Sequence, residues 1–177
     1  MARFTNHTDG IPGPTGPAGP AGSAGSLYYG SFFDELQQSS IQDSVQAIRL
    51  RTTDFANGIS ITGTDSTRIT MGHTGKYNIA FSAQLHQTNS SAIINIWLAK
   101  NGTAVAWTNT KVSITANNPF YVAAWNFFVD ATAGDYYELM WSSNSNHTVI
   151  ETAAPTGSGA NLHPAVPSVI LTVNQVG

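Results

Sequence analysis

Hydrophobic and polar residues alternate with a period of two along most of the chain from residue 28 onward. In the clearest segment, Tyr77, Ile79, Phe81, Ala83 and Leu85 would share one face, with Asn78, Ser82, Gln84 and His86 on the other. The same pattern recurs in Pro167–Gln175, where Val169, Leu171 and Val173 point inward, and at Ile59 and Ile61. This period indicates strands with one buried face, so we expect an all-β protein.

Turn-forming residues divide these segments. Asn101-Gly102, Asn117-Asn118-Pro119 and Ala133-Gly134-Asp135 are typical turn sequences. They predict strands over residues 27–33, 75–87, 91–100, 103–113, 119–130, 135–143 and 167–175. About ten strands at this spacing favour a β-sandwich or jelly roll. The stretch Asp34–Ile48 could form a helix, but we favour a long loop that leads into a strand at Val45–Leu50.

Two predicted strands are apolar on both faces. In Phe120–Asp130, Tyr121, Trp125 and Phe127 lie on one side, whereas Phe120, Val122 and Phe128 lie on the other; Ala92–Ala99 is similar. A strand with two apolar faces is buried once in its own sandwich and once against something else. We therefore predict a subunit interface at Phe120, Val122 and Phe128.

A collagen-like repeat precedes the predicted sandwich. Glycine recurs at every third position without interruption, at Gly10, Gly13, Gly16, Gly19, Gly22 and Gly25. Three polyproline-II chains can wind together only if the residue on the crowded axis lacks a side chain, and the intervening prolines favour that extended form. A flexible linker would have no reason to keep this register. The repeat predicts a short triple helix, hence a homotrimer whose chains the following domain must hold together.

The sequence also resembles the C1q/TNF-like proteins. Gly75-Lys76-Tyr77-Asn78-Ile79-Ala80-Phe81 is similar to the signature strand of C1q-like domains, although Ile79 stands where that family prefers Phe. Gly134-Asp135-Tyr136-Tyr137-Glu138-Leu139 is similar to the turn that opens a late strand in the same family. Joined to the glycine repeat, the resemblance implies a trimeric C1q/TNF-like jelly-roll head on a collagen-like stalk.

Composition narrows the function. Seven Lys+Arg, ten Asp+Glu and a net charge of −3 provide no basic patch for nucleic acid or for a membrane surface. There is no cysteine, no segment of signal-peptide type and no apolar run long enough to span a membrane. This cysteine-free, Asn/Ser/Thr-rich form is more similar to phage virion fibres than to animal proteins, so we expect assembly in a host cytoplasm and a place in the virion.

Candidate chemistry is sparse. The histidines lack metal-ligand spacing, and no nucleophile motif or phosphate loop occurs. Asp135 and Glu138 could contribute to a calcium site, but a turn former and a solvent-facing strand carboxylate is the simpler interpretation. We expect no enzyme activity, no cofactor and no metal.

Three regions follow from these patterns. Residues 1–9 would form a virion-docking peptide around Arg3, Phe4 and Asn6, residues 10–27 the stalk, and residues 28–177 the head. Alternate loops at the distal tip, Gln87–Ser91, Thr115–Asn118 and Ser143–Pro164, would then bind a host-surface glycan or protein. The residues expected to do so are Asn89, Ser90, Asn117, Asn118, Asn144, Asn146 and His147. The alternative is a structural capsid or head decoration fibre whose knob acts mainly as a trimerisation clamp. A bacterial or spore filament shares this architecture.

Overall fold

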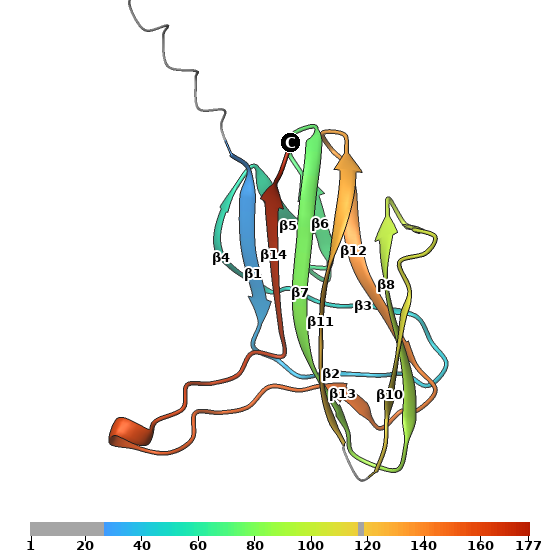
Figure 1. The fold of residues 1–177 in the computed structure, drawn as a ribbon, viewed down its shortest axis with the longest axis vertical. Coiled ribbons are helices and arrows are strands. Elements are labelled where there is room, and N and C mark those ends of the chain that lie inside the picture. The colour runs from blue at the N-terminus through green and yellow to red at the C-terminus, as the bar shows by residue number, and fades with distance from the viewer. Residues whose placement is uncertain (1–26, 117–118) are drawn as a thin grey trace, which may run out of the picture.

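Two stacked antiparallel β-sheets make up the part of the chain that the structure describes (Figure 1). The structure is a computed structural model that describes residues 27–116 and 119–177. Sheet A contains β1 (Tyr29–Asp34), β2 (Gln38–Ser39), β4 (Thr52–Asn57), β7 (Gly75–Gln87), β11 (Phe120–Ala131), β13 (Thr148–Ile150) and β14 (Val169–Gln175). Sheet B contains β3 (Gln46–Ala47), β5 (Ile59–Thr62), β6 (Arg68–Met71), β8 (Ala92–Lys100), β9 (Thr103–Ala104), β10 (Thr110–Ile114) and β12 (Tyr136–Ser143). One short 3₁₀ helix, η1 (Gly159–Asn161), lies between β13 and β14.

Strand β7 organises sheet A. It pairs with β11 along its full length on one side, and with β14 and then β13 on the other. Beyond β14 the sheet continues through β1 to β4. In sheet B the order is β10-β8-β12-β6-β5, with β3 added to β12 and β9 to β8. Because β11 pairs with β7 alone among the described strands, it is an edge strand of sheet A.

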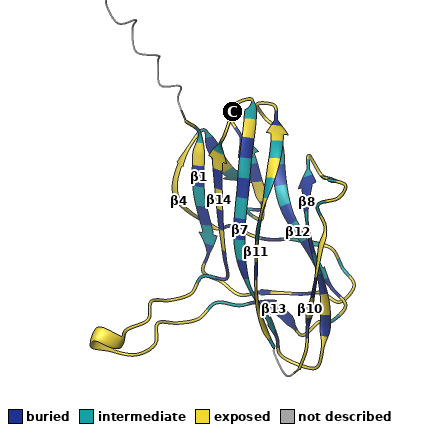
Figure 2. Ribbon diagram, in the orientation of Figure 1, coloured by how far each residue is buried: buried dark blue, intermediate teal, exposed yellow. Residues whose placement is uncertain are grey.

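The core lies between the sheets and is built by the predicted alternation (Figure 2). The inward residues of β7, from Tyr77 to Leu85, are 0–5% exposed, and those of β14 are 0–1% exposed. Ile94, Ile96, Leu139 and Trp141 face them from sheet B and are equally buried. Burial of each such side chain contributes about 1.5–3 kcal/mol, so this contact dominates the stability of the sandwich.

Most predicted strands are confirmed, with small differences in their ends. The prediction for residues 75–87 matches β7. Both ends lie within two residues of the predicted bounds in β8, β11, β12 and β14. The first strand begins at Tyr29 rather than residue 27. The described part of the chain contains fourteen strands rather than about ten, because several additional strands have only two or three residues.

Two predictions of local structure were wrong. Residues 103–113 form two short strands, β9 and β10, because the chain turns at Trp107, whose φ is +66°. The predicted strand Val45–Leu50 shrinks to the two residues of β3. Beyond β3, the amide of Ile48 donates to the carbonyl of Leu139 (2.8 Å) and that of Leu50 donates to Ser66 (2.8 Å), so this segment bonds to different elements in turn. The favoured loop over the preceding residues is confirmed, since no helix forms between residues 34 and 48.

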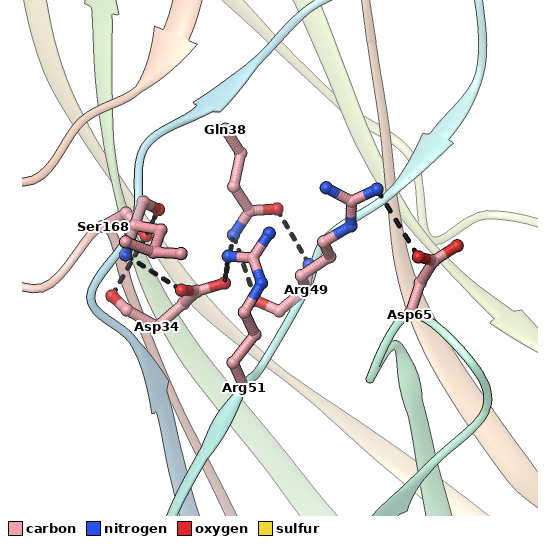
Figure 3. A network of polar contacts seen from close by, with 7 residues as sticks. Asp34, Gln38, Arg49, Arg51, Asp65 and Ser168 are labelled. Atoms are coloured by element: carbon pink, nitrogen blue, oxygen red, sulfur yellow. Dashed lines mark hydrogen bonds and ion pairs between the residues drawn. The ribbon is translucent and has the colours of Figure 1, made fainter.

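A buried polar network holds the segment that crosses from β1 to sheet B (Figure 3). The Asp34 carboxylate is fully buried and accepts hydrogen bonds from Arg51 Nη1 (2.5 Å), Gln38 Nε2 (3.2 Å) and the Leu36 amide (2.9 Å). Ser168 Oγ donates to the carbonyls of Asp34 (3.1 Å) and Leu36 (2.9 Å). The network therefore joins the end of β1, the crossing segment and the start of β14.

Candidate subunit interface and receptor-binding loops

Strand β11 carries an exposed apolar row on the outer face of sheet A. Phe120, Val122 and Phe128 are 57%, 53% and 71% exposed. On the opposite face Ala123 is buried, and Trp125 and Phe127 pack against the core, with the Trp125 ring edge-on to Phe81 at 4.8 Å. The strand is thus apolar on both faces, as predicted. In the single chain its inner face is covered over Trp125 and Phe127, whereas Tyr121, which was predicted on the same side, is 46% exposed.

Beside the middle of β11 the neighbouring strands extend this outer face with uncharged side chains, whereas Lys76 lies opposite Asp130 at the C-terminal end of β11. The register places Ala124 opposite Ser82 and Ile170 on the other side of Ser82. Ile170 is 42% exposed. At one end of the row the Phe120 ring stacks on His86 with the ring centroids 4.1 Å apart, and His86 Nδ1 lies 3.1 Å from Glu151 Oε1. A face of this kind has little charge to desolvate on contact with another surface.

The second predicted two-faced strand, Ala92–Ala99, differs because β8 lies inside sheet B between β10 and β12. Its inner residues Ile94, Ile96 and Leu98 are fully buried. On its outer face Ile93 is 38% exposed, whereas Asn95 and Trp97 are half-buried. This face is less apolar and less exposed than the outer face of β11.

Two of the predicted receptor-binding loops are joined at one end of the sandwich. The amide of Thr88 donates to the His147 carbonyl (2.9 Å), and that of Ile93 donates to Asn144 Oδ1 (2.8 Å). At the same end, the Gln87 amide donates to the Pro119 carbonyl (2.8 Å), which brings in the connection between β10 and β11. We call the described residues at this end the distal loops (residues 88–91, 115–116, 119 and 144–147).

The candidate receptor residues differ in their availability. Asn89, Ser90, Asn144, Asn146 and His147 are exposed. Asn144 already uses its side-chain oxygen to hold the loop. Within residues 27–116 and 119–177, the side chains of Asn89, Ser90, Asn146 and His147 make no hydrogen bond. Asn117 and Asn118 lie outside the described residues, as do Arg3, Phe4, Asn6, the docking peptide of residues 1–9 and the six glycines of the stalk.

The chain enters and leaves the head at the end opposite the distal loops. The amide of Gln175 donates to the Tyr28 carbonyl (2.9 Å), and that of Lys76, at the start of β7, donates to the Gly177 carbonyl (2.7 Å). The Tyr28 ring stacks on His73 with the centroids 3.6 Å apart. Both ends of the head therefore lie together, and the distal loops lie at the far end of β7 (Figure 1).

The predicted loop Ser143–Pro164 is not a single distal loop. It is interrupted by β13, which pairs with β7 in sheet A and fully buries Ile150. The chain then leaves the sandwich as an arm (residues 151–168) that projects to one side and returns to β14 (Figure 1). Isolated bridges pair Ala153 with Val166 and Thr156 with His163, and every residue from 153 to 166 is exposed. The sequence prediction did not include the arm, although Pro155, Pro164 and Pro167 could have indicated a segment outside the sheets.

Asp135 acts as a turn former. Its carboxylate accepts from the Thr132 amide (2.8 Å) and Asn101 Nδ2 (2.8 Å) and lies 2.7 Å from Lys100 Nζ. Hydrogen bonds from Lys100, then Asn101 and the Thr132 amide, lower the pKa of Asp135 to about 2. Glu138 lies away from this turn and accepts from Thr67 Oγ1 (2.7 Å). Its side chain is only 14% exposed, so the expectation of a solvent-facing carboxylate was wrong. Among residues 27–116 and 119–177 no group of three or more His, Cys, Asp or Glu side chains could hold a metal ion.

No helix in the described ranges is both long and apolar enough to cross a membrane. No protein-family model matches the sequence. No curated protein matches it either.

Solved structures do match the fold. Murine APRIL at pH 5.0 aligns with a TM-score of 0.56 and 10% identity over 85% of this chain and all of that one. Eiger TNF from S. frugiperda aligns with a TM-score of 0.55 and 8% identity over 85% of this chain and 93% of that one. The globular domain of zebrafish complement 1qA protein aligns with a TM-score of 0.49. The chain has the fold of a C1q/TNF-like jelly roll.

Proposed function

We propose that the chain forms a homotrimeric virion fibre whose three heads pack through the outer face of sheet A around β11. The observation that carries the proposal is the exposed row of Phe120, Val122 and Phe128 on an edge strand. Burial of each of these side chains would contribute about 1.5–3 kcal/mol before the cost of association is subtracted. C1q/TNF-like domains typically form homotrimers, which supports this arrangement.

The glycine repeat supports the same number of chains. A collagen helix needs three strands in register, and a repeat of six glycines is too short to hold them without help. The head is entered at Leu27 and Tyr28, at the end where its last residue also lies. A trimeric head would therefore bring three stalk segments together at one end and leave three sets of distal loops at the other.

The arm supports an interface that is larger than β11. Ordering each residue costs about 1–2 kcal/mol of conformational entropy, and none of residues 153–166 is buried in the single chain. At the arm's base, Ala153 and Val166 form a cavity of about 160 Å³ with Phe120 and Val122. Because the arm meets the exposed row at this cavity, we place it against a neighbouring subunit.

At the distal loops we propose binding to a host-surface glycan or protein. Asn89, Ser90, Asn146 and His147 offer exposed hydrogen-bonding groups without net charge, which suit sugar hydroxyls. Threefold repetition would convert weak single-site binding into avidity. Attachment to another virion protein through residues 1–9 completes the fibre in this proposal.

A decoration fibre, with the head as a clamp only, is the second candidate. The observation that favours it is the use of Asn144 within the loop, where its side-chain oxygen accepts from the Ile93 amide. In a clamp, the distal polar groups would serve loop structure and solubility.

The mass of the full chain in solution, measured by light scattering, tests the trimer. We expect a trimer for the wild type and dissociation on dilution for Val122→Glu and Phe128→Glu, because each would bury a charge in the interface. Val45→Glu is the matched control, since Val45 is 60% exposed in the segment that crosses to sheet B. A wild-type monomer, or equal dissociation of all three variants, would show that β11 is not the interface.

Binding of the trimer to immobilised host surface material tests adhesion. We expect Asn89→Ala with Asn146→Ala to reduce retention without changing the mass of the trimer. Unchanged retention in this double variant would favour the decoration fibre.

A further inference from the structure

A polar cleft lies on the flank of sheet B, between the segment that crosses from β1 and the turn that precedes β6. Its volume is about 570 Å³, within the ~300–1,000 Å³ range of small-molecule sites. The principal polar side chains that line it are Gln37, Gln46, Arg49, Asp65, Arg68 and Glu138. Trp141 and Glu138 of β12 contribute to its lining from sheet B.

The charges in this flank cleft are balanced. Arg49 Nη2 lies 3.6 Å from Asp65 Oδ1, and Arg68 Nε lies 3.9 Å from Glu138 Oε1. The whole chain has only seven Lys+Arg and ten Asp+Glu, yet two residues of each sign meet here. Both separations exceed the ~3.2 Å limit of a good hydrogen bond, so the guanidinium groups can donate to a further partner and the carboxylates can accept from it.

The walls of the flank cleft are held in place before any ligand arrives. Gln38 fixes the backbone of Arg49 from both sides, because its Oε1 accepts from the Arg49 amide (2.8 Å) and its Nε2 donates to the Arg49 carbonyl (3.0 Å). Gln38 is in turn bonded to the buried Asp34 (Figure 3). On the opposite wall, Thr67 Oγ1 donates to Glu138 Oε1 (2.7 Å) and orients that carboxylate. A rigid site loses less entropy on binding.

We propose that the flank cleft binds a neutral saccharide. A sugar hydroxyl can donate to a carboxylate and accept from a guanidinium, so it can bridge each Arg–acid pair without leaving either charge unpaired. A charged ligand would satisfy one sign and displace the other, and an apolar ligand would leave the polar walls without partners. The volume suits one or two sugar units.

The site is separate from the proposed interface and from the distal loops. It lies against β12 and β6 of sheet B, whereas the exposed row belongs to the edge strand β11 of sheet A. It would stay open in a trimer that packs through β11. Saccharide binding here does not require the distal loops to bind anything.

Saturation-transfer NMR of the full chain with glucose, galactose, mannose, N-acetylglucosamine and rhamnose tests the proposal, with glucuronate and glucosamine as charged probes. We expect transfer to at least one neutral sugar, and about tenfold weaker binding in Arg49→Ala and Asp65→Ala, because each loses a hydrogen bond to a charged group. The side chains of Arg49 and Asp65 are 46% and 68% exposed, so the variants should fold. Lys111→Ala is the control and should bind as the wild type does, because Lys111 is an exposed charged residue of β10 that belongs neither to the flank cleft nor to the distal loops. Asn146→Ala reports separately on sugar binding at the distal loops.

Absence of transfer to every neutral sugar, or tighter binding of a charged probe, would overturn the proposal. Transfer that Asn146→Ala abolishes and Asp65→Ala leaves unchanged would also overturn it, while supporting the distal loops as the receptor site. Weaker sugar binding in Asp65→Ala would support the flank cleft, whether or not the distal loops also bind a sugar.

Discussion

Asp34 and Asp65 each face an arginine, but their surroundings differ. Asp34 is fully buried against Arg51, whereas the Asp65 side chain is 68% exposed beside Arg49. We expect Asp34→Ala to lower the free energy of unfolding by about 3–5 kcal/mol, because it leaves the Arg51 guanidinium without its buried acceptor. Asp65→Ala should cost ~1 kcal/mol or less, since exposed pairs contribute little. Urea unfolding at a single protein concentration measures both, and equal losses would contradict this difference.

Asp135 gives the head a dependence on pH. Its pKa is lowered from 3.8 to about 2, mainly by the hydrogen bond from Lys100. A carboxyl whose folded pKa is depressed stabilises the protein above its unfolded pKa, and that stabilisation is lost as the pH falls through the folded value. We therefore expect the wild type to melt above Asp135→Asn at pH 6 and this difference to disappear between about pH 4 and pH 2. A difference that persists at pH 2 in thermal unfolding would contradict this role for Asp135.

The arm is the element whose ordered conformation has no support from burial within the single chain. Replacement of residues 155–164 by Gly-Gly removes only exposed residues, so the sandwich should keep its circular dichroism spectrum and its core. If the arm packs on a neighbouring subunit, the shortened chain should dissociate at a higher concentration than the wild type. Sedimentation across a dilution series measures this, and Leu162→Ser, which removes one exposed apolar side chain of the arm, should give a smaller change in the same direction. Identical dissociation curves would place the arm outside the interface.

Strand β11 shows how an element can be predicted from two patterns at once. Its inner residues follow the period of two that builds every sandwich, and its outer residues Phe120, Val122 and Phe128 break the usual rule that the other face is polar. The sequence therefore indicated an unusual strand. Its position at the edge of sheet A comes from pairing with β7 over residues far apart in the chain.

For the whole molecule, stalk and head should contribute separable transitions. Gly16→Ala places a methyl group on the crowded axis of the predicted triple helix, so it should abolish or lower the melting of the collagen signal in far-UV circular dichroism. The melting of the head should not change, because residue 16 lies outside it. Ala18→Ser is the control, since position 18 is not a glycine position of the repeat. If neither substitution changes the collagen signal, the repeat is not a triple helix.

The sequence by itself determined the strands of the core and the class of fold. A period of two is a local property, and each strand from β7 to β14 that buries one face repeats it. Because the period is a local property, it could not predict contacts between distant residues. Residues 103–113 and 45–50 alternate well enough to suggest longer strands, but the hydrogen bonds of Ile48 and Leu50 go to Leu139 and Ser66, which no local pattern indicates.

Only the tertiary structure decided which distant residues meet. It joined the distal loops through Thr88 and His147, turned residues 151–168 into an arm, and gathered Arg49, Asp65, Arg68 and Glu138 in one cleft. Charged residues in a charge-poor chain were a visible signal for that cleft, but their pairing depends on how the two sheets stack. Alternation specifies which side chains face inward, whereas the contacts between loops depend on long-range strand pairing that the alternation does not encode.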